Sequence, residues 1–278
     1  MAIERQCRKG RAHLLEAGRM MTREQLQAFA SANGVPLFTQ ERDYAQALFL
    51  FRLYKREAPL IFKGGTCIKL TRDSPRFSED LDFTATRELV EVKSALKAAA
   101  DELNMVGMEA KINQGRARTG GYQCRLKYHG PLYTGEERTA GGVAIDASLR
   151  RDVILRPEWR TIPSPYPDTP PFTAQCMQAQ EILTEKVRAL SIRAAPRDLY
   201  DVWFLLNRGI DPSLRMIDRK LSLYKKRFSI KKFSDSIGRV KLGWKRDLAP
   251  LLSSAPRFET VSREVIARLE PIAGRYRA

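Results

Sequence analysis

The chain has 278 residues, of which 49 are Lys or Arg and 32 are Asp or Glu, so its formal net charge is +17. Its hydrophobic content of 43% is sufficient for a folded core, which excludes a chain that is disordered throughout. So large a positive excess favours a polyanionic partner, with nucleic acid first and an anionic membrane second.

The cysteine and histidine content argues against a zinc site and against secretion. The four cysteines (Cys7, Cys67, Cys124 and Cys176) lie far apart, and only two histidines accompany them. The N-terminal segment lacks the apolar core of a signal peptide, and the longest apolar run, 47–51, is far too short to cross a bilayer. We therefore expect a soluble cytoplasmic protein with reduced thiols and no membrane partner.

Helical and extended patterns alternate through the first half of the chain. Apolar spacing predicts helices over 4–18, 22–33, 40–57 and 88–104, the second capped by Thr22 with Gln25 as its capping-box partner. Short apolar runs predict strands over 59–62, 81–84, 106–113, 121–128 and 141–148. Residues 63–66 are expected to break the first strand before a helical turn at Cys67. This half is therefore expected to be α+β with a mixed sheet.

The second half is predicted to be helical after a proline-dense segment. Six prolines fall within 157–171, a density that blocks helix formation and predicts a linker or a wrapping loop. Helical patterns follow over 174–194, 197–208 and 212–228 and continue less regularly to 276. We therefore expect a first domain over 1–160, a Pro-rich linker over 161–173 and an all-helical, basic C-terminal domain over 174–278.

Most of the positive excess lies near the C-terminus. Residues 211–278 hold 17 Lys and Arg against 7 Asp and Glu, and cations alternate with aromatic residues over 224–233. Cations there can contact phosphates and rings can stack on unpaired bases, although the aromatic residues also suit an ordinary core. The candidate RNA-binding residues are Lys225, Lys226, Arg227, Lys231 and Lys232.

Two groups of residues predict the chemistry. The first is the run Lys63, Gly64, Gly65 and Thr66, where backbone N–H groups and a hydroxyl can approach a phosphate at the start of a helix. The second is Asp80 and Asp82, two residues apart on a strand and therefore on one face. Adjacent carboxylates repel each other unless a hard cation such as Mg²⁺ bridges them. Together the groups indicate nucleotidyl transfer assisted by two metal ions.

Three further residues are candidates for the same site. Asp146 is a lone acid in an apolar strand, and it either joins the metal site and helps to deprotonate an attacking hydroxyl or faces water at a sheet edge. Lys186 lies within an apolar helical stripe, so it either extends to solvent or reaches an internal anion. Asp201 is its expected partner, whereas Asp198 suits an interaction with the helix dipole.

In this order, these segments resemble the AbiEii/AbiGii-type nucleotidyltransferase toxins, which include the MenT toxins. The resemblance is specific over about 60–83 and 181–206. It implies a polymerase-β-like nucleotidyltransferase domain followed by an all-helical domain. It also implies the toxin half of a bacterial toxin–antitoxin or phage-abortive-infection system, with a cognate antitoxin as partner.

The resemblance also implies roles for individual residues. Gly65 and Thr66 would hold the triphosphate, with Thr66 standing where Ser is commoner. Asp80 and Asp82 would bind Mg²⁺, and Lys186 and Asp201 would complete the site. Asp146 is assigned to the site less directly. Ser78 matches a position where some relatives are regulated by phosphorylation. Ser78 would otherwise cap a loop.

In such relatives the toxin adds nucleotides, often pyrimidines, to the 3′ end of tRNA and so stops translation. The resemblance therefore implies an NTP substrate, with CTP favoured, Mg²⁺ as cofactor and tRNA as partner. Asp80→Ala or Lys186→Ala is expected to abolish transfer and leave the fold intact. Transfer to a protein or small molecule, and non-catalytic RNA binding, are the alternatives. A P-loop NTPase and a Rossmann enzyme are excluded because their glycine motifs are absent.

Overall fold

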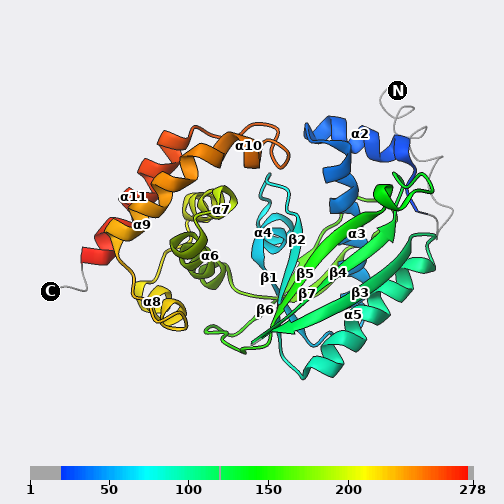
Figure 1. The fold of residues 1–278 in the computed structure, drawn as a ribbon, viewed down its shortest axis with the longest axis horizontal. Helices are drawn as coiled ribbons and strands as arrows, with labels where there is room; N and C mark the ends of the chain where they lie inside the picture. Colours follow the sequence, from blue (N-terminus) through cyan, green and yellow to red (C-terminus); the bar gives the residue numbers. More distant parts are fainter. Residues whose placement is uncertain (1–19, 119, 275–278) are drawn as a thin grey trace, which may run out of the picture.

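A seven-stranded mixed sheet lies at the centre of the computed structural model, which describes residues 20–118 and 120–274 (Figure 1). Its strand order is β3-β4-β5-β2-β1-β7-β6. The pairs β2–β5 and β1–β7 are parallel and the others are antiparallel, which confirms the predicted mixed sheet. The strands are β1 (Leu60–Lys63), β2 (Asp80–Ala85), β3 (Glu109–Arg118), β4 (Gly121–His129), β5 (Gly141–Ser148), β6 (Glu158–Ile162) and β7 (Phe172–Cys176).

Side-chain alternation gives the central strands one apolar and one polar face. In β5, Val143 and Ile145 are buried, whereas Asp146 stays partly exposed on the other side. Helices α3 (Leu37–Tyr54) and α5 (Leu89–Asn104) pack against each other and cover the apolar face (Figure 1). The acidic side chains of the central strands therefore remain on the face that these helices leave open.

The first described helix, α2 (Arg23–Asn33), begins at the predicted capping box. The amide of Gln25 donates to Thr22 Oγ1 (3.3 Å), and the amide of Thr22 donates to Gln25 Oε1 (2.8 Å). These bonds satisfy N–H groups that the first helical turn leaves without partners. The helix predicted over 4–18 lies outside the described residues. None of the described helices is both long and apolar enough to span a bilayer.

The chain passes from β1 directly into helix α4 (Gly64–Arg72). The strand therefore ends within the predicted break, but the helix begins at Gly64 and not at Cys67, because Gly64 adopts a φ of +79° that turns the chain within one residue. A Cβ atom at Gly64 would also lie 2.1 Å from Asp82 Oδ2. Glycine is thus required here both for the turn and for the close approach of β2.

The proline-dense segment contributes strands as well as a wrapping loop. Strands β6 and β7 extend into the predicted linker range, 161–173, because the prolines lie beside these strands and leave their ladders intact. Between them the chain wraps onto α3, where Tyr166 donates to Asp43 (2.7 Å) and accepts from Gln40 Nε2 (2.6 Å). Both ends of the predicted linker range thus belong to the sheet, the middle is a wrapping loop, and the domain boundaries stay a prediction.

The C-terminal part is helical, as predicted, but two helices are shorter than expected. The helix predicted over 174–194 begins only at Ala179, because residues 172–176 form β7, and that predicted over 212–228 ends at Ser222. Lys225 follows with a left-handed φ of +54°, which an α-helix does not accommodate. The helices are α6 (Ala179–Arg193), α7 (Pro196–Asn207), α8 (Leu214–Ser222), α9 (Ile230–Val240), α10 (Trp244–Leu248) and α11 (Phe258–Gly274).

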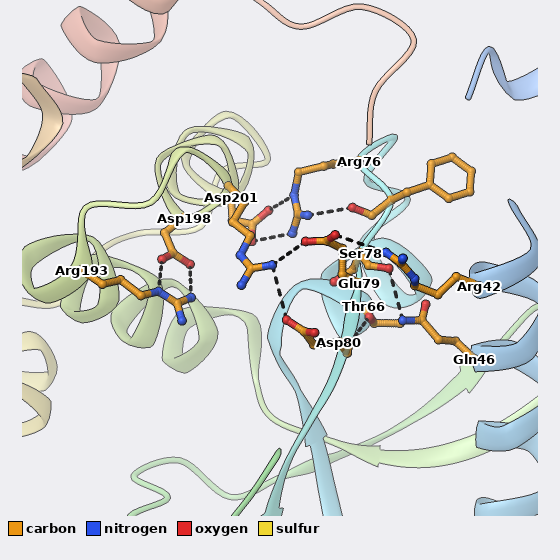
Figure 2. A network of polar contacts seen from close by, with 12 residues as sticks. Arg42, Gln46, Thr66, Arg76, Ser78, Glu79, Asp80, Arg193, Asp198 and Asp201 are labelled. Carbon is orange, nitrogen blue, oxygen red and sulfur yellow. Dashed lines mark hydrogen bonds and ion pairs between the residues drawn. The ribbon is translucent and has the colours of Figure 1, made fainter. Parts of the chain in front are cut away.

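A buried ion pair joins the segment before β2 to α7. Arg76 and Asp201 are each 1% exposed, and the guanidinium donates to both carboxylate oxygens at 2.7 and 2.9 Å (Figure 2). Burial raises the pKa of Asp201, but Arg76 and Lys186 outweigh it and hold that pKa below its usual value. The carboxylate therefore stays charged and ties the helical part to the sheet.

Replacing Asp201 with Ala leaves Arg76 and Lys186 as buried cations without this partner. We expect the free energy of unfolding to fall by about 3–5 kcal/mol. Asp101→Ala is the control, because it removes only an exposed pair with Lys97 and should cost no more than about 0.5 kcal/mol. Urea unfolding measures both variants, and equally small losses would contradict this expectation.

Since the pKa of Asp201 is depressed, its contribution to the free energy of unfolding should be complete above pH ~4 and decline below it.

Candidate active site

Neighbouring strands bring four polar side chains to one level of the sheet. Asp82 on β2 lies in register with Asp146 on β5 and with Lys63 on β1, and Asp146 lies in register with Gln123 on β4. Gln123 Nε2 also donates to Asp146 Oδ2 at 2.7 Å. Paired residues project to the same face, so the expected proximity of Asp146 to the Asp80–Asp82 strand is confirmed.

This face forms the floor of a pocket of about 510 Å³ between the sheet and α6. Five residues predicted from the sequence line it: Lys63, Gly64, Asp82, Asp146 and Lys186. Asp80, Gly65, Thr66, Ser78 and Asp201 do not appear among the described residues of its wall. The structure thus divides the predicted set into side chains that face the pocket and side chains behind its wall.

Asp82 lies in the least favourable position for a carboxylate within this floor. Its pKa is raised to about 6, first because burial disfavours the charged form and then because Asp80 and Asp146 repel it. Lys186 and Lys63 act in the opposite direction, although they do not restore the usual pKa. Burial therefore decides the direction of the shift, and a further cation close to Asp82 would favour its charged form.

A divalent cation fits the oxygens of Asp82 and Asp146. Hard cations prefer carboxylate oxygens, and a bound cation would offset the burial and the smaller repulsion by Asp80 and Asp146 that raise the pKa of Asp82. In the part of the chain that the structure describes, no three His, Cys, Asp or Glu side chains already form a metal site. Substrate phosphates and water would have to supply the remaining ligands, as is common for Mg²⁺.

Asp80 is turned toward an arginine instead of the pocket. Its carboxylate lies 3.4 Å from Arg197 Nη1, which also pairs with Glu79 (2.9 Å). Glu79 in turn pairs with Arg42 on α3 at 3.2 Å (Figure 2). Asp80 therefore belongs, in this conformation, to an ion-pair chain that crosses from α7 to α3.

Residues 65, 66 and 78 lie behind the pocket wall. The Thr66 hydroxyl, expected to hold a phosphate, donates instead to the main-chain carbonyl of Asp80 (2.6 Å) and so fixes α4 to β2. Ser78 is buried, and a Cβ atom at Gly65 would approach Ser78 Oγ to 2.8 Å and Arg76 Nη2 to 2.4 Å. The absence of a side chain at Gly65 therefore makes room for the arginine that pairs with Asp201.

Lys186 reaches internal anions, as one of its two interpretations predicts. Its ammonium lies 2.7 Å from Asp201 and 3.3 Å from Asp198, and the side chain is 10% exposed. Burial lowers the pKa of Lys186, but the two aspartates outweigh this and keep it above its usual value. The expected Lys186–Asp201 pair is confirmed, and the lysine remains charged at the pocket wall.

Asp198 is the main residue that the sequence interpretation missed. It is completely buried and accepts two hydrogen bonds from Arg193 (2.7 and 2.9 Å; Figure 2) besides its contact with Lys186. Burial raises the pKa of Asp198, but Lys186 and Arg193 outweigh this effect and lower the pKa to about 2. Its place in the first turn of α7 suggested only a dipole interaction. The sequence could have suggested the contact with Lys186 only through the spacing of twelve residues, which places the two side chains on either side of a helix–helix turn.

A second buried group of charges supports the other side of the pocket. Glu185 pairs with Lys63 and Lys220, each at 3.1 Å, and Lys220 also contacts Glu181 (2.8 Å). Burial raises the pKa of Glu185, but these lysines lower it to about 2. The group therefore fixes Lys63, the residue paired with Asp82 on the sheet, to helices α6 and α8.

The predicted RNA-binding residues Lys225, Lys226, Arg227, Lys231 and Lys232 are all exposed. Of the aromatic residues among them, Phe233 is buried in the core, whereas Tyr224 lines the pocket and is 40% exposed. The core interpretation is thus right for Phe233. The basic segment begins at the edge of the pocket.

Comparisons with known proteins agree with this geometry. A family model described as "Nucleotidyl transferase AbiEii toxin, Type IV TA system" matches residues 48–264. No curated protein sequence matches the chain.

Solved structures show the same fold at low sequence identity. The nucleotidyltransferase toxin MenT4 from Mycobacterium tuberculosis has a TM-score of 0.65 and 20% identity, with 90% of each chain covered. JHP933 from Helicobacter pylori has a TM-score of 0.54 and 19% identity, covering 85% of this chain and 92% of its own. Another H. pylori nucleotidyltransferase structure gives 0.55 and 19%, covering 85% and 96%.

The family model spans most of the chain, and it supplies the activity that the fold alone would leave open. The non-catalytic alternative is thereby set aside. The chain belongs to the AbiEii nucleotidyltransferase toxins of type IV toxin–antitoxin systems.

Proposed function

We propose that this nucleotidyltransferase transfers NMP from an NTP to the 3′ end of tRNA in the cytoplasm and thereby blocks translation. CTP is the expected nucleotide and Mg²⁺ the expected cation. Membership of a toxin–antitoxin family implies an antitoxin partner. The chemistry of the pocket supports the choice of tRNA acceptor, nucleotide and cation.

The observation that carries the proposal is the register of Asp82 and Asp146 on the floor of a pocket with basic walls. Paired carboxylates suit the cation that accompanies a triphosphate, and an exposed arginine such as Arg118 suits the phosphates. The exposed basic segment that starts beside the pocket suits an RNA acceptor much longer than a single nucleotide. A small-molecule acceptor would leave this segment without a role.

Each residue then has a task in the reaction. Asp82 and Asp146, with Asp80 once it leaves Arg197, would hold Mg²⁺, which stabilises negative charge on the phosphates. Lys186 faces the pocket as a charged ammonium and neutralises phosphate oxygens, and Gly64 lets the triphosphate approach the start of α4. Asp201 holds Lys186 in place from behind.

The transfer needs no reactant besides the RNA and the NTP. The oxygen of the RNA 3′-hydroxyl attacks the α-phosphorus, a new phosphodiester bond forms, and the bond to pyrophosphate breaks. Asp146, held by Gln123, is placed to accept the hydroxyl proton. Pyrophosphate leaves toward the basic wall.

Asp82→Asn keeps the shape of the side chain but removes its charge, so it should reduce transfer at least about a hundredfold. Stability should stay equal or rise, because the substitution also removes a repelled carboxylate. Asp80→Ala should likewise abolish transfer. Lys186→Ala should abolish transfer too, but it should also lower stability because it leaves Asp198 and Asp201 with fewer partners. Transfer assays and urea unfolding measure these effects, and full activity of Asp82→Asn would exclude Asp82 as a ligand of the cation.

The acceptor can be identified by incubating the protein with labelled NTP, total RNA and a cell lysate. We expect label at the 3′ end of tRNA, with CTP the most efficient donor, and no label with Asp82→Asn. Label in protein or in a small molecule would favour the alternative acceptors and exclude tRNA as the main substrate.

A further inference from the structure

Two arginines from different elements contact the ring of one tyrosine at the edge of the pocket. The guanidinium carbons of Arg150 and Arg188 lie 5.5 and 5.4 Å from the ring centroid of Tyr224. Arg150 follows β5, Arg188 lies on α6, and Tyr224 lies in the turn after α8. All three line the pocket, so segments far apart in the sequence meet at this point.

The backbone around this group is closely determined. The amides of Tyr224 and Lys226 both donate to the carbonyl of Leu221, at 2.8 and 3.2 Å, which closes the turn that presents the ring. Gly120 lies next to Arg150, because a Cβ atom at Gly120 would lie 2.6 Å from Arg150 Nε. The chain therefore keeps space for the arginine at a position where any side chain would displace it.

The two arginines differ from three other cations of the pocket in their partners. Lys63, Lys186 and Arg193 are each paired with a buried or nearly buried carboxylate. Across residues 20–118 and 120–274, by contrast, no ion pair joins Arg150 or Arg188 to a carboxylate. A tyrosine face attracts a guanidinium and orients it without using its N–H donors. Those donors are thus available to an anion, and phosphate oxygens match their planar arrangement.

We propose that Arg150, Arg188 and Tyr224 form a clamp for backbone phosphates of the acceptor RNA strand, close to its reactive 3′ end. The proposal rests on RNA being the acceptor. The position favours the strand over the triphosphate, because Arg150 and Tyr224 are exposed and Lys225, Lys226 and Arg227 continue the positive charge outward from the clamp. Tyr224 is a positioning residue, since it acts by holding the two guanidinium groups.

The test uses the full-length chain and a short single-stranded RNA whose 3′-deoxy end prevents transfer. Binding is measured by fluorescence anisotropy at several salt concentrations. Each lost phosphate contact on a single strand reduces the slope of log K against log salt by about 0.7. Arg150→Met/Arg188→Met should therefore reduce the slope by about 1 to 1.5 and raise the KM for RNA at least tenfold, with the KM for NTP unchanged.

Three further variants separate positioning from general effects. Tyr224→Ala should weaken RNA binding in the same direction, whereas Tyr224→Phe, which keeps the ring, should bind like the wild type. Arg208→Met is the matched control, because Arg208 lies over the ring of Phe204 (5.1 Å) and does not line the pocket. It should leave the salt slope unchanged.

Several outcomes would overturn the clamp. These are an unchanged salt slope in the double arginine variant, a rise confined to the KM for NTP, an equal effect of Arg208→Met, or weak binding by Tyr224→Phe. Transfer to RNA by wild type together with an unchanged slope would reject the clamp and keep the proposed function. A reduced slope in a protein that labels no RNA would show that these residues bind RNA, but it would reject RNA as the acceptor and with it the role of the clamp at the 3′ end.

Discussion

The burial of one carboxylate, Asp82, beside a second at the same level of the sheet is the constraint on which the pocket depends. The parallel register of β2 and β5 places Asp82 beside Asp146, and strand alternation turns both away from the apolar face under α3 and α5. Two such charges are costly in a partly dehydrated site unless cations surround them. Lys63 and Lys186 approach them from the sheet and from α6, and the raised pKa of Asp82 shows that the two lysines do not fully offset its burial.

The cations of the site are themselves held by buried acids. Adjacent residues of α6 serve both sides, because Glu185 pairs with Lys63 and Lys220 while Lys186 pairs with Asp198 and Asp201. Buried pairs of this kind add little net stability, since desolvation offsets their attraction, but removing one partner is costly. Their value here is geometric: they fix the lysines at set positions without neutralising the floor of the pocket.

Patterns with a local physical cause could be predicted from the sequence. The capping box at Thr22, the strand over 141–148 and the apolar stripe around Lys186 each depend on neighbours within a few residues, and each appears in the structure. The charge excess correctly indicated exposed cations after residue 224.

Features that depend on long-range packing could not be predicted. Prolines beside β6 and β7 suggested a linker, because nothing local shows that their flanks pair with a distant strand. The helical periodicity of 212–228 also concealed the left-handed turn at Lys225. Arg76 and Asp198 were missed because a buried ion pair is defined by a partner that the sequence does not identify. The individual site roles remain predictions.

The central claim is that Asp82 and Asp146 hold the cation that accompanies the triphosphate. A crystal structure of the protein with Mn²⁺ and a non-hydrolysable CTP analogue tests it most directly, because Mn²⁺ is located by its anomalous scattering. We expect a manganese peak between the two carboxylates, with the triphosphate extending toward Gly64 and Lys186. A nucleotide and cation bound elsewhere, with neither aspartate as a ligand, would contradict it.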